Sequence, residues 1–188
     1  DPKISPIDLL APDYKEKLNE HKTSQSKASE IGNAIKHHIN INLDEDPEYY
    51  KKLSERLEDI IEKHEERWDE MVQLLLDLRD NIEDDHEKEA DVLGLTQTEL
   101  SFYNILIAEL DNDKNIDSKK IKKVKEVVRL LVQLLNDATQ IVDFFNKWDE
   151  QKRVKKEIKH IVIENFDESL VKNITERFLE LAKVKFKQ

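Results

Sequence analysis

The stretch AIKHHININLDEDPEYYKKLSERLEDII, residues 34–61, decides how the first half of the chain folds. It holds the end of one predicted helix, an acidic turn and the start of the next helix. Asp46 precedes Pro47, and an Asp side chain accepts hydrogen bonds from the free N–H groups of a first helical turn. Proline suits the first helical position because its missing N–H would have no partner there. No proline follows Pro47, so a long helical run is permitted.

The composition is typical of an all-α protein. The 188 residues include only two Gly and four Pro, and 39% are charged. The chain has no Cys, which excludes disulfides and thiolate metal sites. No apolar run is long enough to span a bilayer, so we expect no membrane partner. Because the chain begins at Asp1 without an initiator Met, we expect a fragment of a longer polypeptide.

The net charge of −11 is unevenly distributed. Residues 1–111 carry 13 basic and 29 acidic side chains, whereas residues 112–188 carry 18 basic and 13 acidic ones. Such a division can steer a charged partner or attract one half of the chain to the other.

Two apolar seams predict long helices. The first runs from Pro47 with steps of three and four through residues 50, 53, 57, 60, 64, 68, 71, 75, 78 and 82. This helix would continue to Leu93 and stop at Gly94, with a break near 83–85 as the alternative. The second seam occupies residues 121, 124, 128, 131, 135, 138, 142 and 145, and Ser118 would cap its helix.

The shorter elements follow from caps and breakers. Residues 1–23 form a predicted lead-in with a turn at 7–10 and a short helix, and the helical domain covers 24–188. A helix over 24–41 contains Gly32, which we interpret as a site of close packing. Thr96 and Glu99 form a capping box. The polar stretch 111–117 breaks the pattern, the next helix starts at 146 or 147, and Asp167 caps the last helix.

The predicted fold is an elongated all-α bundle in one domain. Its spine would be two long antiparallel helices near 47–93 and 118–145, with shorter helices at the ends. The predicted core includes Leu57, Leu75, Leu131 and Leu135.

Three pieces of the sequence resemble the C-terminal helical domain of the R (restriction and motor) subunit of type I restriction-modification enzymes. They are residues 34–61, then GLTQTELSFYNIL at 94–106, then FNKWDEQKRVKKEIKHIV at 145–162. The resemblance implies a prokaryotic, cytoplasmic parent subunit that is an ATP-dependent deoxyribonuclease using ATP and Mg. It implies methyltransferase and specificity subunits as partners, with DNA contacted through the whole complex.

The fragment itself is predicted to be non-catalytic and to hold no cofactor. A phosphate-binding loop needs closely spaced glycines, but Gly32 and Gly94 lie far apart. The resemblance therefore favours an assembly domain that docks the motor onto the methyltransferase–specificity core.

A helical-bundle enzyme with a two-metal centre is a remote alternative. Its ligands would come from two Glu-x-x-His pairs, Glu83 with His86 and Glu157 with His160. Helix geometry turns His160 towards solvent, which argues against the metal site. His37 and His38 point about 100° apart, so we expect one packed and one exposed side chain rather than two ligands. His64 lies on the first seam and is expected to be a hydrogen-bonded core histidine.

Basic clusters make a DNA-contacting helical module the nearer alternative. Lys152, Lys155, Lys156 and Lys159 share one predicted helix face, as phosphate contacts would. The predicted contact residues, for nucleic acid or for a protein partner, are Lys119, Lys122, Lys123, Lys152, Arg153, Lys155, Lys156 and Lys159.

Overall fold

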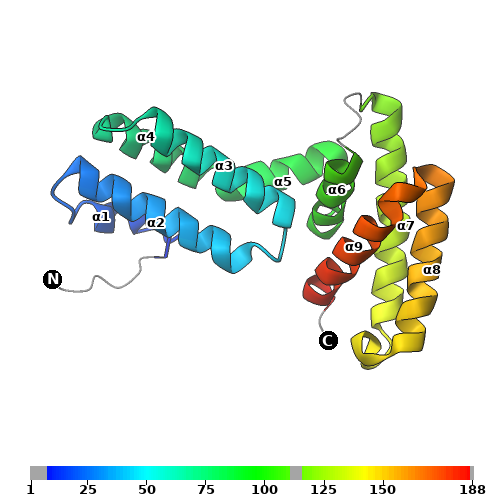
Figure 1. The fold of residues 1–188 in the computed structure, drawn as a ribbon. Helices are drawn as coiled ribbons and strands as arrows, with labels where there is room; N and C mark the ends of the chain where they lie inside the picture. Colours follow the sequence, from blue (N-terminus) through cyan, green and yellow to red (C-terminus); the bar gives the residue numbers. More distant parts are fainter. Residues whose placement is uncertain (1–7, 111–115, 187–188) are drawn as a thin grey trace. The chain divides into compact units, whose positions relative to one another are not determined.

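The computed structural model describes residues 8–110 and 116–186, apart from the side chain of Glu83. No strand occurs in these described ranges, which confirms the all-α prediction. Figure 1 shows the helices. They are α1 (Tyr14–Leu18), α2 (Ser24–Asn42), α3 (Pro47–Lys63), α4 (Trp68–Asp80), α5 (Ile82–Leu93), α6 (Gln97–Leu110), α7 (Ser118–Thr139), η1 (Phe144–Asn146), α8 (Trp148–Asn165), η2 (Glu168–Leu170) and α9 (Val171–Lys185).

The described chain divides into two compact units, each with its own apolar core. Unit 1 contains residues 8–43 and 49–88, and unit 2 contains 44–48, 89–110 and 116–186. One boundary therefore falls in the turn between α2 and α3, and the other two fall inside α3 and α5. Compact units need not fold separately, so the single domain predicted over 24–188 stays a prediction.

Unit 1 is built around the packing of α2 on α4. Ile31 and Ile35 of α2 are buried together with Leu57 and Leu75, which confirms the last two as core residues. The structure corrects the interpretation of Gly32. A Cβ atom placed there would meet nothing within 4 Å, so close packing does not require this glycine.

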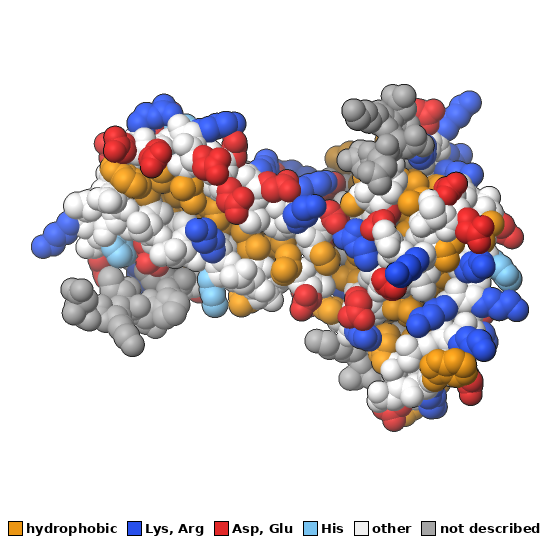
Figure 2. All heavy atoms as spheres, viewed as in Figure 1, with side chains coloured by type: hydrophobic (Ala, Val, Ile, Leu, Met, Phe, Trp, Pro, Cys, Tyr) orange, Lys and Arg blue, Asp and Glu red, His pale blue; other side chains and the backbone are white. Residues whose placement is uncertain are grey.

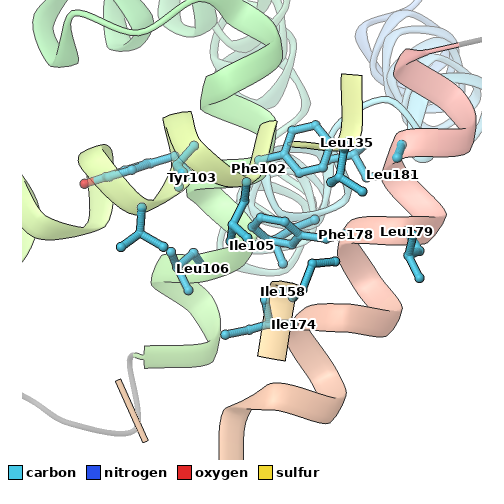
Figure 3. Packing of buried hydrophobic residues seen from close by; sticks show 14 of the residues in the cluster. Phe102, Tyr103, Ile105, Leu106, Leu135, Ile158, Ile174, Phe178, Leu179 and Leu181 are labelled. Carbon is cyan, nitrogen blue, oxygen red and sulfur yellow. The ribbon is translucent and has the colours of Figure 1, made fainter. Parts of the chain in front are cut away.

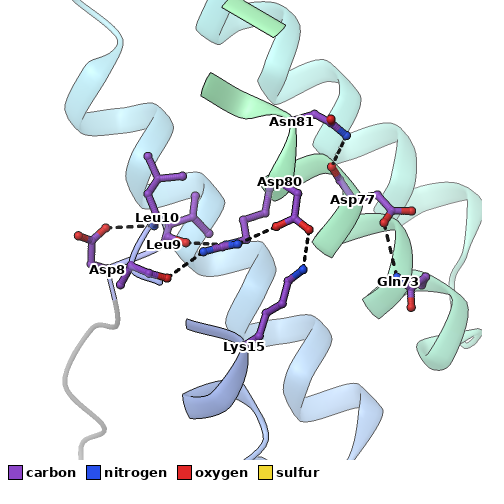
Figure 4. A network of polar contacts seen from close by, with 10 residues as sticks. Asp8, Leu9, Leu10, Lys15, Gln73, Asp77, Asp80 and Asn81 are labelled. Atoms are coloured by element: carbon purple, nitrogen blue, oxygen red, sulfur yellow. Dashed lines mark hydrogen bonds and ion pairs between the residues drawn. The ribbon is translucent and has the colours of Figure 1, made fainter. Parts of the chain in front are cut away.

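A polar network ties the lead-in segment to α4 (Figure 4). Arg79 donates from Nε to the Leu9 carbonyl at 2.7 Å and from Nη2 to the Ala11 carbonyl at 3.0 Å. Asp80 accepts from Arg79 at 2.7 Å and from Lys15 at 2.6 Å. Part of the predicted turn at 7–10 lies outside the described residues, but Leu9 is buried in the core of unit 1. The described part of the lead-in, residues 8–23, is therefore an integral part of unit 1.

The single long helix predicted over 47–93 is wrong, because the chain turns twice. The first helix ends at Lys63, and Glu66 adopts a left-handed φ of 66° before α4 begins. A second interruption falls at Asn81, two residues before the predicted alternative break. The apolar spacing continues through both turns because α3, α4 and the start of α5 all contribute to one core. Periodicity alone therefore could not reveal the breaks.

Unit 2 is a four-helix arrangement around α6 (Figure 3). α6 packs against α7 and α9, and α7 packs against α8. Seven consecutive residues of α6 are buried, from Leu100 to Leu106. Phe102 lies against Phe178 of α9, with ring centroids 5.0 Å apart. α6 is thus the central element of this core.

The caps that bound α5 and α6 match the prediction. Gly94 has φ +64°, and the Leu95 N–H donates to the Ala90 carbonyl at 3.0 Å, as in a Schellman motif. The Thr96 N–H donates to the Glu99 carboxylate at 2.8 Å, and the Glu99 N–H donates to the Thr96 hydroxyl at 3.1 Å. This is the reciprocal capping box.

Other predicted boundaries in unit 2 need correction. The second long helix ends at Thr139 rather than 145, because the chain turns through Asp143 at φ 58°. The turn buries Phe144 and leaves Val142 exposed, although the seam predicted the reverse. Asp117 rather than Ser118 caps α7, since its carboxylate reaches the Lys120 N–H at 2.8 Å. Asp167 caps η2 ahead of α9.

The prediction that two long antiparallel helices form a spine is also wrong. Residues 49–88 belong to unit 1, whereas α7 packs within unit 2 against α6, α8 and α9. Leu131 and Leu135 are fully buried there, as predicted. The predicted break over 111–117 lies outside the described residues except for 116 and 117.

We expect Leu131→Asp to abolish the cooperative unfolding of unit 2. Leu131 is 0% exposed, and an unpaired buried carboxylate costs several kcal/mol. The adjacent variant Leu130→Asp is the control, because Leu130 is 55% exposed and its substitution should change stability by about 0.5 kcal/mol or less. Thermal unfolding followed by circular dichroism measures both. Equal effects of the two variants would remove Leu131 from the core.

The buried phenol of Tyr14 should make unit 1 sensitive to alkaline pH. Burial, with help from Glu30 and against Arg79, raises the pKa of Tyr14 to about 12. The folded state then holds its proton more tightly than the unfolded chain, so stability is full below pH 10 and falls as pH rises from 10 to 12. The loss is about 2.7 kcal/mol at most.

The variant Tyr14→Phe isolates this effect. The Tyr14 hydroxyl is buried and has no hydrogen-bond partner in the described structure, so its removal should not destabilise the fold at pH 7. Urea unfolding at pH 8, 10 and 11.5 should show a smaller alkaline loss in the variant than in the parent chain. An identical loss in both would contradict the role of Tyr14.

Candidate functional site

One stripe of apolar side chains on α8 is buried, and this determines which way the basic side chains of the helix point. Val154, Ile158 and Val162 are fully buried in the core of unit 2. At 100° per residue, the lysines on the other side of the helix must face outward. The start of α8 is fixed by Gln151, whose side chain donates to the Phe145 carbonyl at 2.8 Å.

The outward face of α8 forms one wall of an open groove, and α9 forms the other. Figure 2 shows Lys and Arg side chains gathered over these helices. The groove has a volume of about 730 Å³. Its lining residues are Asp149, Lys152, Arg153, Lys155, Lys156, Lys159, Val171, Lys172, Thr175 and Glu176. The structure thus brings together all five contact residues predicted on α8.

The cations of the groove are only partly neutralised. Arg153 bonds Glu150 and Glu157, each at 3.2 Å, and Lys159 lies 3.8 Å from Glu168. Within the described residues, no ion pair joins a carboxylate to Lys155, Lys156 or Lys172. The positive charge of these three lysines therefore faces solvent.

The three predicted contact residues of α7 do not line this groove. Lys119, Lys122 and Lys123 are exposed near the start of α7. The Lys123 ammonium lies 5.9 Å from the centre of the Phe166 ring. Their role in binding stays a prediction. Unlike the predicted contact residues of α8, they are not among the residues that line the groove.

The histidines take the packing roles expected of them. His38 packs edge-on against Tyr50, whereas His37 is exposed. His64 is partly buried, and its Nδ1 lies 3.0 Å from the Ile60 carbonyl. His160 is exposed, as helix geometry predicted. Across the described side chains, no cluster of three or more His, Cys, Asp or Glu could hold a metal ion.

A second charged cluster fixes the segment 44–48 onto unit 2. The Arg177 guanidinium bonds Glu48 through Nη2 and Glu109 through Nη1, the latter at 2.9 Å. Buried Asp46 accepts from Asn104 at 3.3 Å, and this aspartate stands immediately before α3, as predicted. Burial lowers the pKa of Arg177, but the two carboxylates outweigh burial and raise it. The guanidinium therefore stays charged.

Comparison with known proteins identifies a family and a relative that resemble this chain in sequence. Residues 2–188 match the family described as "Type I restriction enzyme HindI endonuclease subunit-like, C-terminal". The chain belongs to this family. A relative from Methanocaldococcus jannaschii, named "Putative type I restriction enzyme MjaIXP endonuclease subunit", is 28% identical over 154 residues. The alignment covers 77% of this chain but only 14% of that relative. No solved structure matches the chain.

The family match confirms the resemblance to the C-terminal region of the type I endonuclease subunit. The three pieces that carry the resemblance lie on different elements. Residues 34–61 span the end of α2, the acidic turn and α3, while 94–106 and 145–162 hold most of α6 and α8. Of the helices formed by described residues, none has the length and apolar content needed to cross a bilayer.

Sequence reasoning missed Trp148, which adjoins the groove, and five of the residues that line it, namely Asp149, Val171, Lys172, Thr175 and Glu176. Lys172 and Thr175 come from α9, and nothing in their local pattern links them to α8. Trp148 was identifiable, because it lies four residues before Lys152 and therefore on the same helix face. Its indole is exposed, and the Lys152 ammonium lies 4.8 Å from the ring centre.

We expect Arg177→Met to destabilise unit 2 and loosen the segment 44–48. The carboxylates of Glu48 and Glu109 are 13% and 14% exposed, so they would be left largely buried without their cation. The expected loss is about 2 to 3 kcal/mol, because removing one partner of a buried pair leaves an uncompensated charge. Hydrogen exchange of residues 44–48 together with urea unfolding measures this effect.

Arg153→Met is a matched control for that experiment. Arg153 also bridges two carboxylates, but its side chain is 55% exposed. Exposed pairs contribute about 0 to 1 kcal/mol, so stability should change little. A similar loss from both variants would show that burial does not distinguish the two clusters.

Proposed function

We propose that this chain is a non-catalytic helical assembly domain of a type I restriction enzyme endonuclease subunit. It would dock the ATP-dependent DNA translocase and endonuclease subunit onto the methyltransferase–specificity core. The observation that carries this proposal is the family match over residues 2–188 to a C-terminal region of such subunits. ATP and Mg would then act in the parent subunit, with cytoplasmic DNA reached through the whole complex.

Exposed apolar side chains of unit 2 are candidate docking contacts. Val92 is 86% exposed and Val142 is 68% exposed, and Leu130 projects from α7. Partner proteins often recognise helices through spaced apolar side chains of this kind. Single exposed apolar residues also occur on ordinary surfaces, so each residue must be tested separately.

The charge of unit 1 favours a partner with a basic surface. Residues 49–88 carry seven basic and fourteen acidic side chains, and nearly all of them lie on α3, α4 and α5. Complementary charge accelerates association and suppresses wrong partners more than it adds affinity. Docking should therefore become slower as the salt concentration rises.

Binding of the 188-residue chain to its purified cognate methyltransferase–specificity core tests the proposal. We expect a complex at micromolar concentration in a pull-down and in biolayer interferometry. The variants Val92→Asp, Leu130→Asp and Val142→Asp should include at least one that weakens binding more than fivefold, as expected for an interface hot spot.

The unfolding midpoint of each variant is the control, since exposed positions should leave stability unchanged. Lys36→Glu, at an exposed position of α2, is a second control for altered charge. If the parent chain does not bind the core even at about 50 µM, the docking proposal is overturned.

A further inference from the structure

Trp148 lies at the head of the lysine row on α8. At 100° per residue, Trp148, Lys152, Lys155, Lys156 and Lys159 fall within about 100° of one another around the helix axis. The indole is 69% exposed. Among the described residues, its one ring contact is with the Lys152 ammonium, so one face of this large apolar ring adjoins positive charge.

The groove beside this row is suited to phosphate. Six of its ten lining residues are Lys or Arg and two are acidic. The ion pairs that Arg153 and Lys159 make are solvent-exposed, so an incoming phosphate can compete with them. Thr175 is 92% buried by area, and its hydroxyl has no hydrogen-bond partner in the described structure. The hydroxyl oxygen itself is not solvent-accessible, so the Thr175 side chain would have to rotate before it could donate to a phosphate oxygen in the groove.

The length of the row allows contact with several nucleotides. From Trp148 to Lys159 the helix rises about 16 Å, at 1.5 Å per residue. Aromatic side chains beside a basic groove bind single strands because every base has a face on which they can stack. The bases of an intact duplex are stacked on each other, so they offer no such face to an indole on the protein surface.

We propose that the α8/α9 groove binds a single nucleic-acid strand, with the lysines contacting phosphates and Trp148 stacking on a base. This site goes beyond the docking function and does not depend on it. Asp149 lines the groove next to Trp148 and repels phosphate at that end. The phosphate contacts therefore concentrate at Lys155, Lys156, Lys159 and Lys172, while the Trp148 end receives a base.

Fluorescence anisotropy of the 188-residue chain with a labelled 12-nucleotide oligothymidylate tests the site. We expect the single strand to bind at least fivefold more tightly than a duplex of equal length in 50 mM salt. Affinity should fall with salt concentration, with a log–log slope of about 0.7 for each phosphate contact.

Two triple variants separate a specific site from general charge. Lys155→Glu/Lys156→Glu/Lys159→Glu should lower single-strand affinity more than tenfold and reduce the salt slope by about 2. The matched control is Lys119→Glu/Lys122→Glu/Lys123→Glu on α7, which changes the net charge equally at exposed lysines outside the groove. Equal losses from both triples would reduce the effect to overall charge and overturn the proposal.

Trp148→Ala tests stacking. It should lower single-strand affinity at least fivefold and leave duplex affinity unchanged, because stacking on one base contributes about 1 to 3 kcal/mol. The chain has two tryptophans, so Trp68→Phe leaves Trp148 as the reporter, and its fluorescence should be quenched by the oligonucleotide. Unchanged single-strand affinity in Trp148→Ala would overturn the assignment of a single strand.

The two proposals can fail independently. The groove triple variant should still bind the methyltransferase–specificity core with parental affinity and keep its unfolding midpoint. If the same variant loses core binding but keeps oligonucleotide binding, the groove is a protein-docking surface and the nucleic-acid site is overturned.

Discussion

The burial of Val154, Ile158 and Val162 fixes the rotation of α8 about its axis, and the candidate site depends on that rotation. Each buried aliphatic side chain contributes about 1.5 to 3 kcal/mol, so turning the stripe towards water would be strongly unfavourable. With the stripe held in the core, the lysines of α8 face outward beside α9. The apolar core therefore positions a polar surface, although none of its residues needs to touch a ligand.

Charged residues serve two different purposes in unit 2. Arg177 with Glu48 and Glu109 is a largely buried cluster whose members compensate one another and hold the segment 44–48. The α8 lysines are exposed and only partly paired, so their charge remains available to solution. Arg153 lies between these cases, since it is paired twice but on the surface. Burial decides whether a charge acts in stability or in recognition, because water screens the exposed groups.

Membership of the type I endonuclease subunit family and the geometry of the groove support separate functional proposals. The family match concerns the chain from residue 2 to 188, and it supports docking within a multi-subunit enzyme. The groove concerns ten residues of α8 and α9, and it supports a nucleic-acid contact on its own chemistry. An assembly domain that also binds a single nucleic-acid strand could keep DNA near the endonuclease subunit, which the same domain would attach to the complex.

The sequence by itself determined the helical class, most caps and the outward direction of the α8 lysines. These features are local: the Thr96–Glu99 capping box, the positive φ at Gly94 and a period of 3.6 residues each depend on neighbours along the chain. Only the tertiary structure decided where the seams break, which core each helix joins, and that Lys172 and Thr175 face the α8 lysines. Apolar periodicity says that a face is buried without saying against what. A turn whose flanking helices enter the same core therefore leaves the pattern unbroken, as between α3 and α4.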